Sequence, residues 1–342
     1  MTGNRLLRVL VATCALALAL AACGKKEAPG AAGGGGGGGG QAVKVAFVPK
    51  LVGIPYFEAM KTGGDKAAKD LGVQFIYQGD TTADPAKQAE IINSLIQQKV
   101  TVLAVAPNDP AAIAPLLKRA ADAGIKVITS DTDAPDSVRQ VFVNQAEDKS
   151  IGEATAEALA SQMGGQGKWA IVSCGQTAQN LNAWIGIEKS YIKGKYPGMQ
   201  LVDTVYAGED QAKSVQLAKD LMTAHPDLKG LIGQCSVSAP GVAQAVTELN
   251  KVGKVFTTGV STPSSMKQYI KSGAQSKTVL WDVTKLGYLT VWAGQQLAQG
   301  KSFQPTNDVP NVGQVKYDAS KKMLVLGPPL VFTKENVDQY DF

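Results

Sequence analysis

The sequence predicts an α/β protein of two lobes, each built on a doubly wound parallel sheet, because strand and helix patterns alternate along most of the chain. From residue 43 onward, short apolar runs rich in β-branched residues recur between amphipathic stretches. Buried parallel strands joined by helices have this pattern. Roughly four or five such units precede residue 145, and about as many follow it. That division favours two similar sheets over the alternative, a single TIM barrel.

The first 22 residues are expected to be a signal peptide that is removed. Arg5 and Arg8 precede an apolar run at residues 9–22, which is short for a bilayer span. The run ends in Leu-Ala-Ala before Cys23, and this ending resembles the lipobox of bacterial lipoproteins. Cys23 is therefore expected to carry lipid and to hold the exported protein at a membrane, in the periplasm or on the outer cell surface. The alternative is an ordinary signal peptide that leaves Cys23 as a free thiol.

Residues 23–42 are expected to form a lipid-anchored, glycine-rich linker. Eight consecutive glycines occupy residues 33–40, and no strand pattern precedes them, which argues against a phosphate-binding loop. A glycine-rich coil of roughly 20 residues has a typical reach of about 25 Å. The linker would separate the folded body from the membrane.

The strands expected in the folded body are residues 43–48, 73–77, 102–106, 125–129, 169–174, 201–206, 231–234, 255–260 and 278–281. Helical patterns lie between them, as at residues 86–98, where four isoleucine and leucine side chains share one side.

Polar residues follow these strands. Since ligands of open parallel sheets bind beyond the carboxyl ends of the strands, we expect the binding site to be formed there. The segments are residues 49–51, 107–109, 130–133, 174–176, 234–236, 261–263 and 281–282. They contain several carboxylates, one lysine and one large aromatic residue, which suits a small polar ligand. For Asn108 and Asp109, capping of the following helix explains the residues as well as ligand contact does.

The composition excludes several classes of function. The 34 Lys and Arg residues are scattered, without the clustered face of a nucleic-acid-binding protein. The single histidine, His225, lies where a helix should end, so histidine-dependent triads and multi-histidine metal sites are not expected. No cofactor or metal is predicted.

Five segments carry a resemblance to a known family. They read FVPKLVGIPYF at residues 47–57, SDTD at 130–133, VSTP at 260–263, LWDV at 280–283 and FTKENVDQYDF at 332–342. They resemble the type I periplasmic sugar-binding proteins of ABC importers, in the branch that binds rhamnose and autoinducer-2.

The resemblance implies two Rossmann-like lobes joined by three hinge crossings, near Val143 and Asn144, near residues 281–283 and near residues 310–313. Lobe 1 would comprise residues 43–143 and 284–310, and lobe 2 residues 144–283 and 311–342. It also implies a monomeric solute receptor rather than an enzyme, with an ABC permease and its ATPase as partners.

The family's ligand contacts transfer to particular residues. Lys50 and Asp131 match residues that bind ligand hydroxyls, and Tyr56 and Phe57 match the aromatic pair that flanks a sugar ring. Asp282, beside Trp281, matches an acidic residue that binds sugar from the second crossing. The remaining candidates in lobe 2 are Asn180, Gln234 and Ser236.

The second lobe departs from the autoinducer-2 branch. Asn180-Leu181 replaces an Asp-Gln pair, and Gln234 and Ser236 replace a proline and an alanine. A leucine side chain forms no hydrogen bond. We therefore expect a monosaccharide, a deoxyhexose such as rhamnose or a pentose.

Three alternatives remain open at this point: an autoinducer-2 receptor, a ligand-sensing partner of a membrane signalling receptor, and an extracytoplasmic carbohydrate enzyme. The last would use Asp131 and Asp133, two residues apart, for acid–base chemistry. Trp184 is expected to pack within a helix.

Cys174 and Cys235 end the first and third strands of lobe 2. In the doubly wound order these strands are neighbours, and an exported protein meets oxidising conditions. A disulfide between the two residues is one hypothesis, and two buried free thiols are the other.

Overall fold

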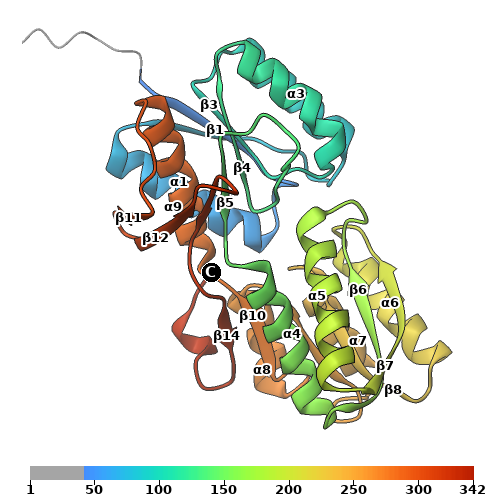
Figure 1. Ribbon diagram of the computed structural model, residues 1–342. Helices are drawn as coiled ribbons and strands as arrows, with labels where there is room; N and C mark the ends of the chain where they lie inside the picture. The colour runs from blue at the N-terminus through green and yellow to red at the C-terminus, as the bar shows by residue number, and fades with distance from the viewer. Residues whose placement is uncertain (1–41) are drawn as a thin grey trace, which may run out of the picture. The chain divides into compact units, whose positions relative to one another are not determined.

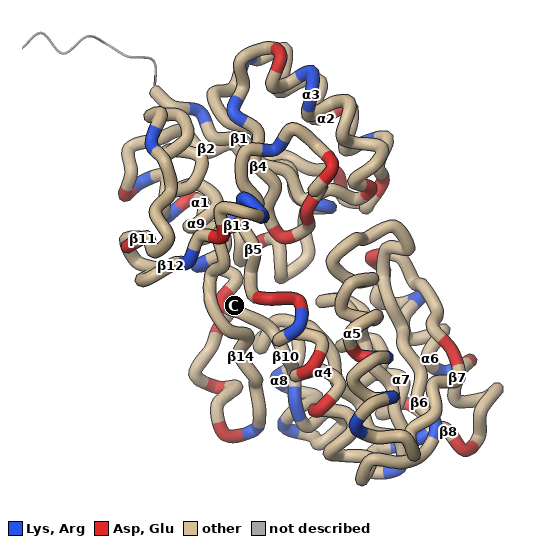
Figure 2. Tube along the Cα trace, in the orientation of Figure 1, with Lys and Arg blue, Asp and Glu red and all other residues tan. Residues whose placement is uncertain are grey.

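A computed structural model describes residues 42–342 as two α/β lobes (Figure 1). The predicted signal peptide, the lipid site at Cys23 and residues 23–41 of the linker lie outside the described residues. In the part of the chain that is described, no helix has the length and apolar character that a membrane span requires. Basic and acidic residues are interspersed over both lobes (Figure 2).

Lobe 1 is built on an eight-stranded sheet in the order β11-β12-β13-β5-β4-β3-β1-β2. The pairs from β2 to β13 are parallel, whereas β11 and β12 form an antiparallel edge. Its elements are β1 (Lys44–Val48), α1 (Pro55–Leu71), β2 (Gln74–Tyr77), α2 (Pro85–Gln97), β3 (Val102–Val105), α3 (Pro110–Asp122), β4 (Lys126–Ser130), β5 (Val141–Asn144), α9 (Val283–Ala298), β11 (Thr306–Val309), β12 (Gly313–Asp318) and β13 (Met323–Val325).

Lobe 2 is built on a six-stranded sheet in the order β14-β10-β9-β8-β6-β7. Only the pair of β10 with β14 is antiparallel. Its elements are α4 (Asp148–Met163), β6 (Gln166–Ser173), α5 (Gln179–Lys195), β7 (Gly198–Tyr206), α6 (Gln211–Ala224), β8 (Leu228–Gly233), α7 (Ser238–Glu248), β9 (Phe256–Val260), α8 (Pro263–Ser272), β10 (Lys277–Leu280), β14 (Leu330–Phe332) and the 3-10 turn η1 (Val337–Gln339).

Both sheets have the doubly wound order expected from the sequence, and each of the nine predicted strands is present. The prediction missed β5 and the strands after α9. These strands have three to six residues, and several pair only at a sheet edge, so their apolar patterns are short.

Four helices, α1, α2, α3 and α8, begin with a proline, and the residue before each proline is the N-cap. Asp84 and Asp109 cap α2 and α3 by accepting hydrogen bonds from backbone N–H groups of the first turn. Thr262 does the same for α8, whereas α1 has no side-chain cap. Proline fits here because its missing N–H would have no partner within the helix. Asp109 is therefore a helix cap, one of the two roles left open for it.

The chain passes between the lobes three times, and the third crossing differs from the prediction. The first two lie at residues 145–147 and 281–282, close to the expected places. The expected third crossing at residues 310–313 is instead the turn between β11 and β12, where Asn311 and Gly313 have positive φ angles of 60° and 103°. The chain then adds β12 and β13 to the first sheet, so residues 311–325 belong to lobe 1 and the crossing follows at residues 326–329.

Helices α1 and α9 lie against each other at glycines (Figure 1). A Cβ atom at Gly287 would collide with the carbonyl of Met60, and one at Gly63 would collide with the carbonyl of Thr284. Only glycine permits this close approach of the two backbones. The packing fixes the first turn of α1 relative to the second crossing, which immediately precedes α9.

Substituting Gly287 by alanine should therefore destabilise the protein by about 1–3 kcal/mol, because the added methyl group forces the two helices apart. The matched control is Gly186→Ala, on an exposed face of α5 where a Cβ meets no atom within 4 Å. This control should be neutral or gain up to about 1 kcal/mol from helix propensity. Urea unfolding of both variants measures the difference, and equal losses would contradict the close-packing argument.

Candidate functional site

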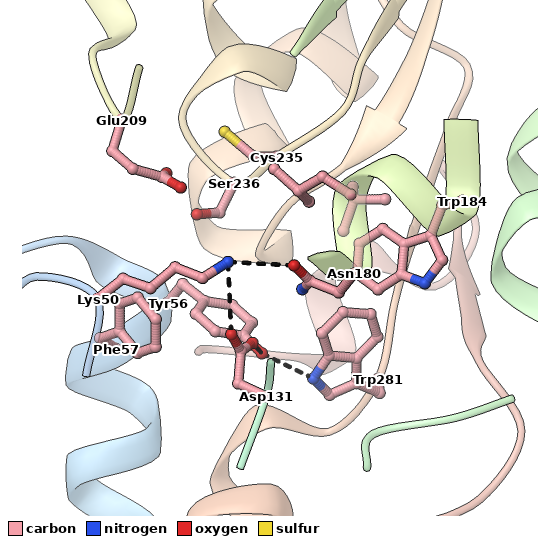
Figure 3. Close-up of a pocket in the computed structure, with 12 residues that line it drawn as sticks. Lys50, Tyr56, Phe57, Asp131, Asn180, Trp184, Glu209, Cys235, Ser236 and Trp281 are labelled. Carbon is pink, nitrogen blue, oxygen red and sulfur yellow. Dashed lines mark hydrogen bonds and ion pairs between the residues drawn. The ribbon is translucent and has the colours of Figure 1, made fainter. Parts of the chain in front are cut away.

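The carboxyl ends of strands from both sheets converge on one pocket (Figure 3). About 350 Å³ of space lies between its lining atoms, with the solvent at its mouth included. Its lining residues are Lys50, Tyr56, Phe57, Asp131, Asn180, Leu181, Trp184, Glu209, Cys235, Ser236, Val260 and Trp281.

Asp131 directly follows β4 and has a left-handed backbone conformation, with φ of 68°. An aspartate tolerates this conformation better than most residues, and such backbones are frequent at functional sites. Its Oδ1 accepts from the Tyr56 hydroxyl at 2.7 Å, and its Oδ2 accepts from the Thr132 hydroxyl at 2.9 Å. The carboxylate is thereby held in a defined orientation at the pocket.

Lys50 lies across the pocket from lobe 1 to lobe 2. Its Nζ donates to Asn180 Oδ1 at 3.2 Å and lies 3.8 Å from Asp131 Oδ2, as Figure 3 shows. The Lys50 side chain is 6% exposed, so its ammonium forms these contacts in a largely buried position. The side-chain amide of Asn108 donates to the backbone carbonyl of Lys50 at 2.9 Å and so helps to hold the backbone of this residue in place. Asn108 also forms part of a second bridge between the lobes, because its carbonyl accepts from the Thr177 hydroxyl at 3.0 Å.

Aromatic rings form much of the pocket wall. Tyr56 packs edge to face on Phe57 and on Trp281, with ring centroids 5.0 and 5.9 Å apart, and Trp184 packs on Trp281 at 5.8 Å. The Trp281 indole donates to the Tyr56 hydroxyl at 3.2 Å. Burial, together with the neighbouring Asp131 carboxylate, raises the pKa of Tyr56 well above its usual value, so its hydroxyl remains a donor at neutral pH.

Lobe 2 contributes a carboxylate, a hydroxyl and a disulfide. Glu209 follows β7 and is half-buried, and burial raises the pKa of its carboxyl while the Lys50 charge lowers it. A disulfide joins Cys174 and Cys235, with their Cα atoms 6.0 Å apart. Their sulfur atoms and a Glu209 carboxylate oxygen lie within 4.8 Å of one another. Disulfide sulfurs are not thiolates, so this group is a carboxylate beside a disulfide rather than a set of metal ligands.

Seven of the nine predicted ligand-binding residues lie at the pocket, and two do not. Gln234 is fully buried behind it, where its amide donates to Glu188. Asp282 caps α9, with its Oδ1 accepting from the backbone N–H of Lys285 at 2.9 Å. Asp133 does not line the pocket either, and both of its oxygens accept from the Arg139 guanidinium at 2.6 Å.

The prediction missed Glu209 as a pocket residue, and for Trp184 it favoured packing in a helix over stacking on the ligand. Glu209 follows a predicted strand after Ala207 and Gly208, so its strand-end position was a usable signal. Trp184 does pack in α5, where its indole donates to Asp148 at 2.8 Å, and its ring also lines the pocket. Leu181 and Val260 add aliphatic surface to the lining.

Comparison with known proteins supports this fold. A family model described as a periplasmic binding protein domain matches residues 45–302. The chain is 24% identical over 262 residues to the ribose import binding protein RbsB of Salmonella typhimurium, covering 76% of this chain and 86% of that protein.

Two solved structures are similar over most of the chain. One is LsrB from Clostridium saccharobutylicum in complex with AI-2, with a TM-score of 0.83 and 30% identity, covering 88% of this chain and all of that one. The other is an ABC transporter solute binding protein from Clostridium phytofermentas with bound L-rhamnose, with a TM-score of 0.83 and 28% identity, covering 88% and 98%.

These matches confirm the resemblance and the fold inferred from the sequence. The family consists of extracytoplasmic solute-binding proteins and not of enzymes. The chain belongs to the type I periplasmic sugar-binding proteins of ABC transporters.

Proposed function

We propose that this protein captures a single monosaccharide, a deoxyhexose such as rhamnose or a pentose, between its lobes and delivers it to an ABC permease. The observation that carries the proposal is the composition of the pocket, in which charged and amide groups face one another between aromatic rings. We further propose that it acts as a monomer.

The polar groups suit a ligand with several hydroxyls. Asp131 and Glu209 offer carboxylate oxygens as acceptors, and Lys50 offers a buried ammonium as a donor. Asn180 offers both an acceptor and donors. Hydrogen bonds to charged groups contribute roughly 1.5–3 kcal/mol each. A few such contacts suffice for micromolar binding, which requires about 8 kcal/mol net.

The apolar groups suit the carbon skeleton of a sugar. The Tyr56, Phe57 and Trp281 rings can cover the C–H face of a pyranose or furanose. Leu181 and Val260 add an aliphatic surface that the methyl group of a deoxyhexose would contact. An L-rhamnose complex among the similar structures supports this choice.

The alternative ligand is autoinducer-2, because the similar LsrB structure contains AI-2. Leu181 argues against it, since this side chain forms no hydrogen bond where the autoinducer-2 branch has a polar pair. A role as the ligand-sensing partner of a membrane receptor would use the same pocket, and neighbouring genes for a permease and an ATPase would favour transport.

Binding would be coupled to closure of the lobes. Lys50 and Asn180 come from different lobes, so a ligand that touches both binds the closed form more tightly than the open one. That difference in affinity is the free energy available for closing the cleft.

Replacing Asp131 by asparagine should weaken sugar binding about 10- to 100-fold, because a charged acceptor becomes a neutral amide. Isothermal titration calorimetry with L-rhamnose and with pentoses measures the effect. The matched control is Asp282→Asn, which changes the same chemistry at the α9 cap and outside the pocket lining. The control should bind as the wild type does. Wild-type affinity in Asp131→Asn would refute the assignment of Asp131 to the binding site. An equal loss of affinity in both variants would show that the effect of Asp131→Asn is not specific to the pocket.

We also propose that lipid on Cys23 anchors the exported protein to a membrane. The support is the apolar run and the lipobox-like residues before Cys23. Cells expressing the wild type should incorporate radiolabelled palmitate into the protein, and Cys23→Ala should abolish the label and release the protein from the membrane fraction. Equal membrane association of the two proteins would contradict the anchor.

A further inference from the structure

A buried polar pair lies directly behind the pocket lining of lobe 2. Glu188 of α5 and Gln234, at the end of β8, are both fully buried. The Gln234 amide nitrogen donates to Glu188 Oε1 at 2.8 Å. The other oxygen of each side chain, Glu188 Oε2 and Gln234 Oε1, is buried without a hydrogen-bond partner.

The two side chains already share one hydrogen bond, yet each has an oxygen without a partner. This arrangement indicates that a proton on one of these oxygens is missing. An ionised carboxylate and an amide oxygen can only accept, so neither can satisfy the other. A carboxylic acid with its proton on Oε2 can donate to Gln234 Oε1. One proton thus converts a singly bonded pair into a ring of two hydrogen bonds and provides both oxygens with a partner.

The surroundings of Glu188 favour this neutral form. Burial raises the pKa of Glu188 to about 8, and the hydrogen bond from Gln234 and the charge of exposed Lys189 lower it by less. The charged groups on neighbouring elements are engaged elsewhere or exposed. Lys149 pairs with Glu153, Glu157 pairs with Lys195, Lys168 pairs with Asp227, Asp148 accepts from Trp184, and Lys193, Asp203 and Lys229 are exposed.

The pair is connected to the pocket through the backbone. Gln234 immediately precedes Cys235 and Ser236, both of which line the pocket. Residue alternation places Gln234 on the same face of the sheet as Ile232, under α4 and α5, while Cys235 joins the disulfide. On the neighbouring strand Ser173, whose hydroxyl is also buried and unpartnered, precedes Cys174. The register of β6 with β8 brings Ser173 beside Gln234.

We propose that Glu188 is a neutral carboxylic acid that forms a doubly hydrogen-bonded pair with Gln234, and that this pair positions the Gln234–Ser236 segment of the ligand pocket. Glu188 is a positioning residue, because it does not line the pocket and acts through Gln234. The effect on ligand affinity rests on the proposed function, whereas the protonation state and its effect on folding do not.

The pair makes stability dependent on pH in a defined direction. An unfolded glutamate has a pKa of about 4.3 and ionises above it, while folded Glu188 keeps its proton up to about pH 8. Between these values the folded state binds more protons than the unfolded state. The contribution of Glu188 to stability is therefore full below about pH 4 and declines as pH rises to about 8. The folding equilibrium constant should fall by up to about tenfold per pH unit in this window.

The variant Glu188→Gln tests this directly, because a second amide preserves both hydrogen bonds of the ring and cannot ionise. Infrared spectra of the ligand-free protein at pH 6, recorded as wild type minus Glu188→Gln, should show the C=O band of a protonated carboxylic acid. The band should disappear above about pH 8. Its absence at pH 6 would overturn the proposal, because Glu188 would then be ionised.

Two further measurements separate the pair from its role at the pocket. Denaturant unfolding from pH 5 to 9 should show that the free energy of unfolding of the wild type declines relative to that of Glu188→Gln. The same pH dependence in both proteins would overturn the proposal.

Calorimetry with L-rhamnose should show wild-type affinity in Glu188→Gln at pH 6 and at least a tenfold loss in Gln234→Leu. Affinity that is unchanged in Gln234→Leu would remove the positioning role. If no sugar bound even the wild type, the proposed function would fail while the infrared and unfolding results remained valid.

Discussion

The Lys50 ammonium, held between Asp131 of its own lobe and Asn180 of the other, is the interaction on which the architecture of the site depends. A buried ammonium is unfavourable unless anionic and hydrogen-bonding groups surround it. Asp131 belongs to lobe 1 and Asn180 to lobe 2, so both contacts of Lys50 form only when the lobes are together. Any ligand that binds between the lobes has to share or replace these contacts. Ligand recognition and lobe closure therefore use the same few atoms.

On the lobe 1 side, the packing of α1 against α9 holds this arrangement in place. The glycines that let α1 and α9 approach closely fix the first turn of α1, and with it Tyr56, relative to Trp281 at the second crossing. The Tyr56 hydroxyl then accepts from Trp281 and donates to Asp131. The close packing of α1 against α9 therefore helps to fix the orientation of the Asp131 carboxylate in the pocket. On the lobe 2 side, the disulfide and the Glu188–Gln234 pair constrain the ends of β6 and β8.

Much of this was predictable from the sequence, because the signals are local. Apolar runs predicted the nine main strands, and residues that follow strands, such as Lys50 and Asp131, lie at the pocket by the general behaviour of parallel sheets. Asp282 and Gln234 illustrate the limit of that reasoning. Both follow strands, yet one side chain turns back to cap α9 and the other faces the helices behind the sheet. A position just after a strand does not by itself give the direction of the side chain. Alternation along β8 turns Gln234 away from the pocket, and the start of α9 turns Asp282 toward its backbone. The third crossing was misplaced for a similar reason, since the short strands β12 and β13 form only through pairing at the edge of the first sheet.

The central claim, that the pocket between the lobes binds a monosaccharide, is tested most directly by a thermal-shift screen of the purified protein against deoxyhexoses, pentoses, hexoses and autoinducer-2. A ligand that binds only the folded state raises the melting temperature by mass action. The account predicts a concentration-dependent rise with a deoxyhexose or a pentose that exceeds the rise with autoinducer-2. A rise with autoinducer-2 alone would contradict the account. It would also be contradicted if no sugar in the panel raised the melting temperature.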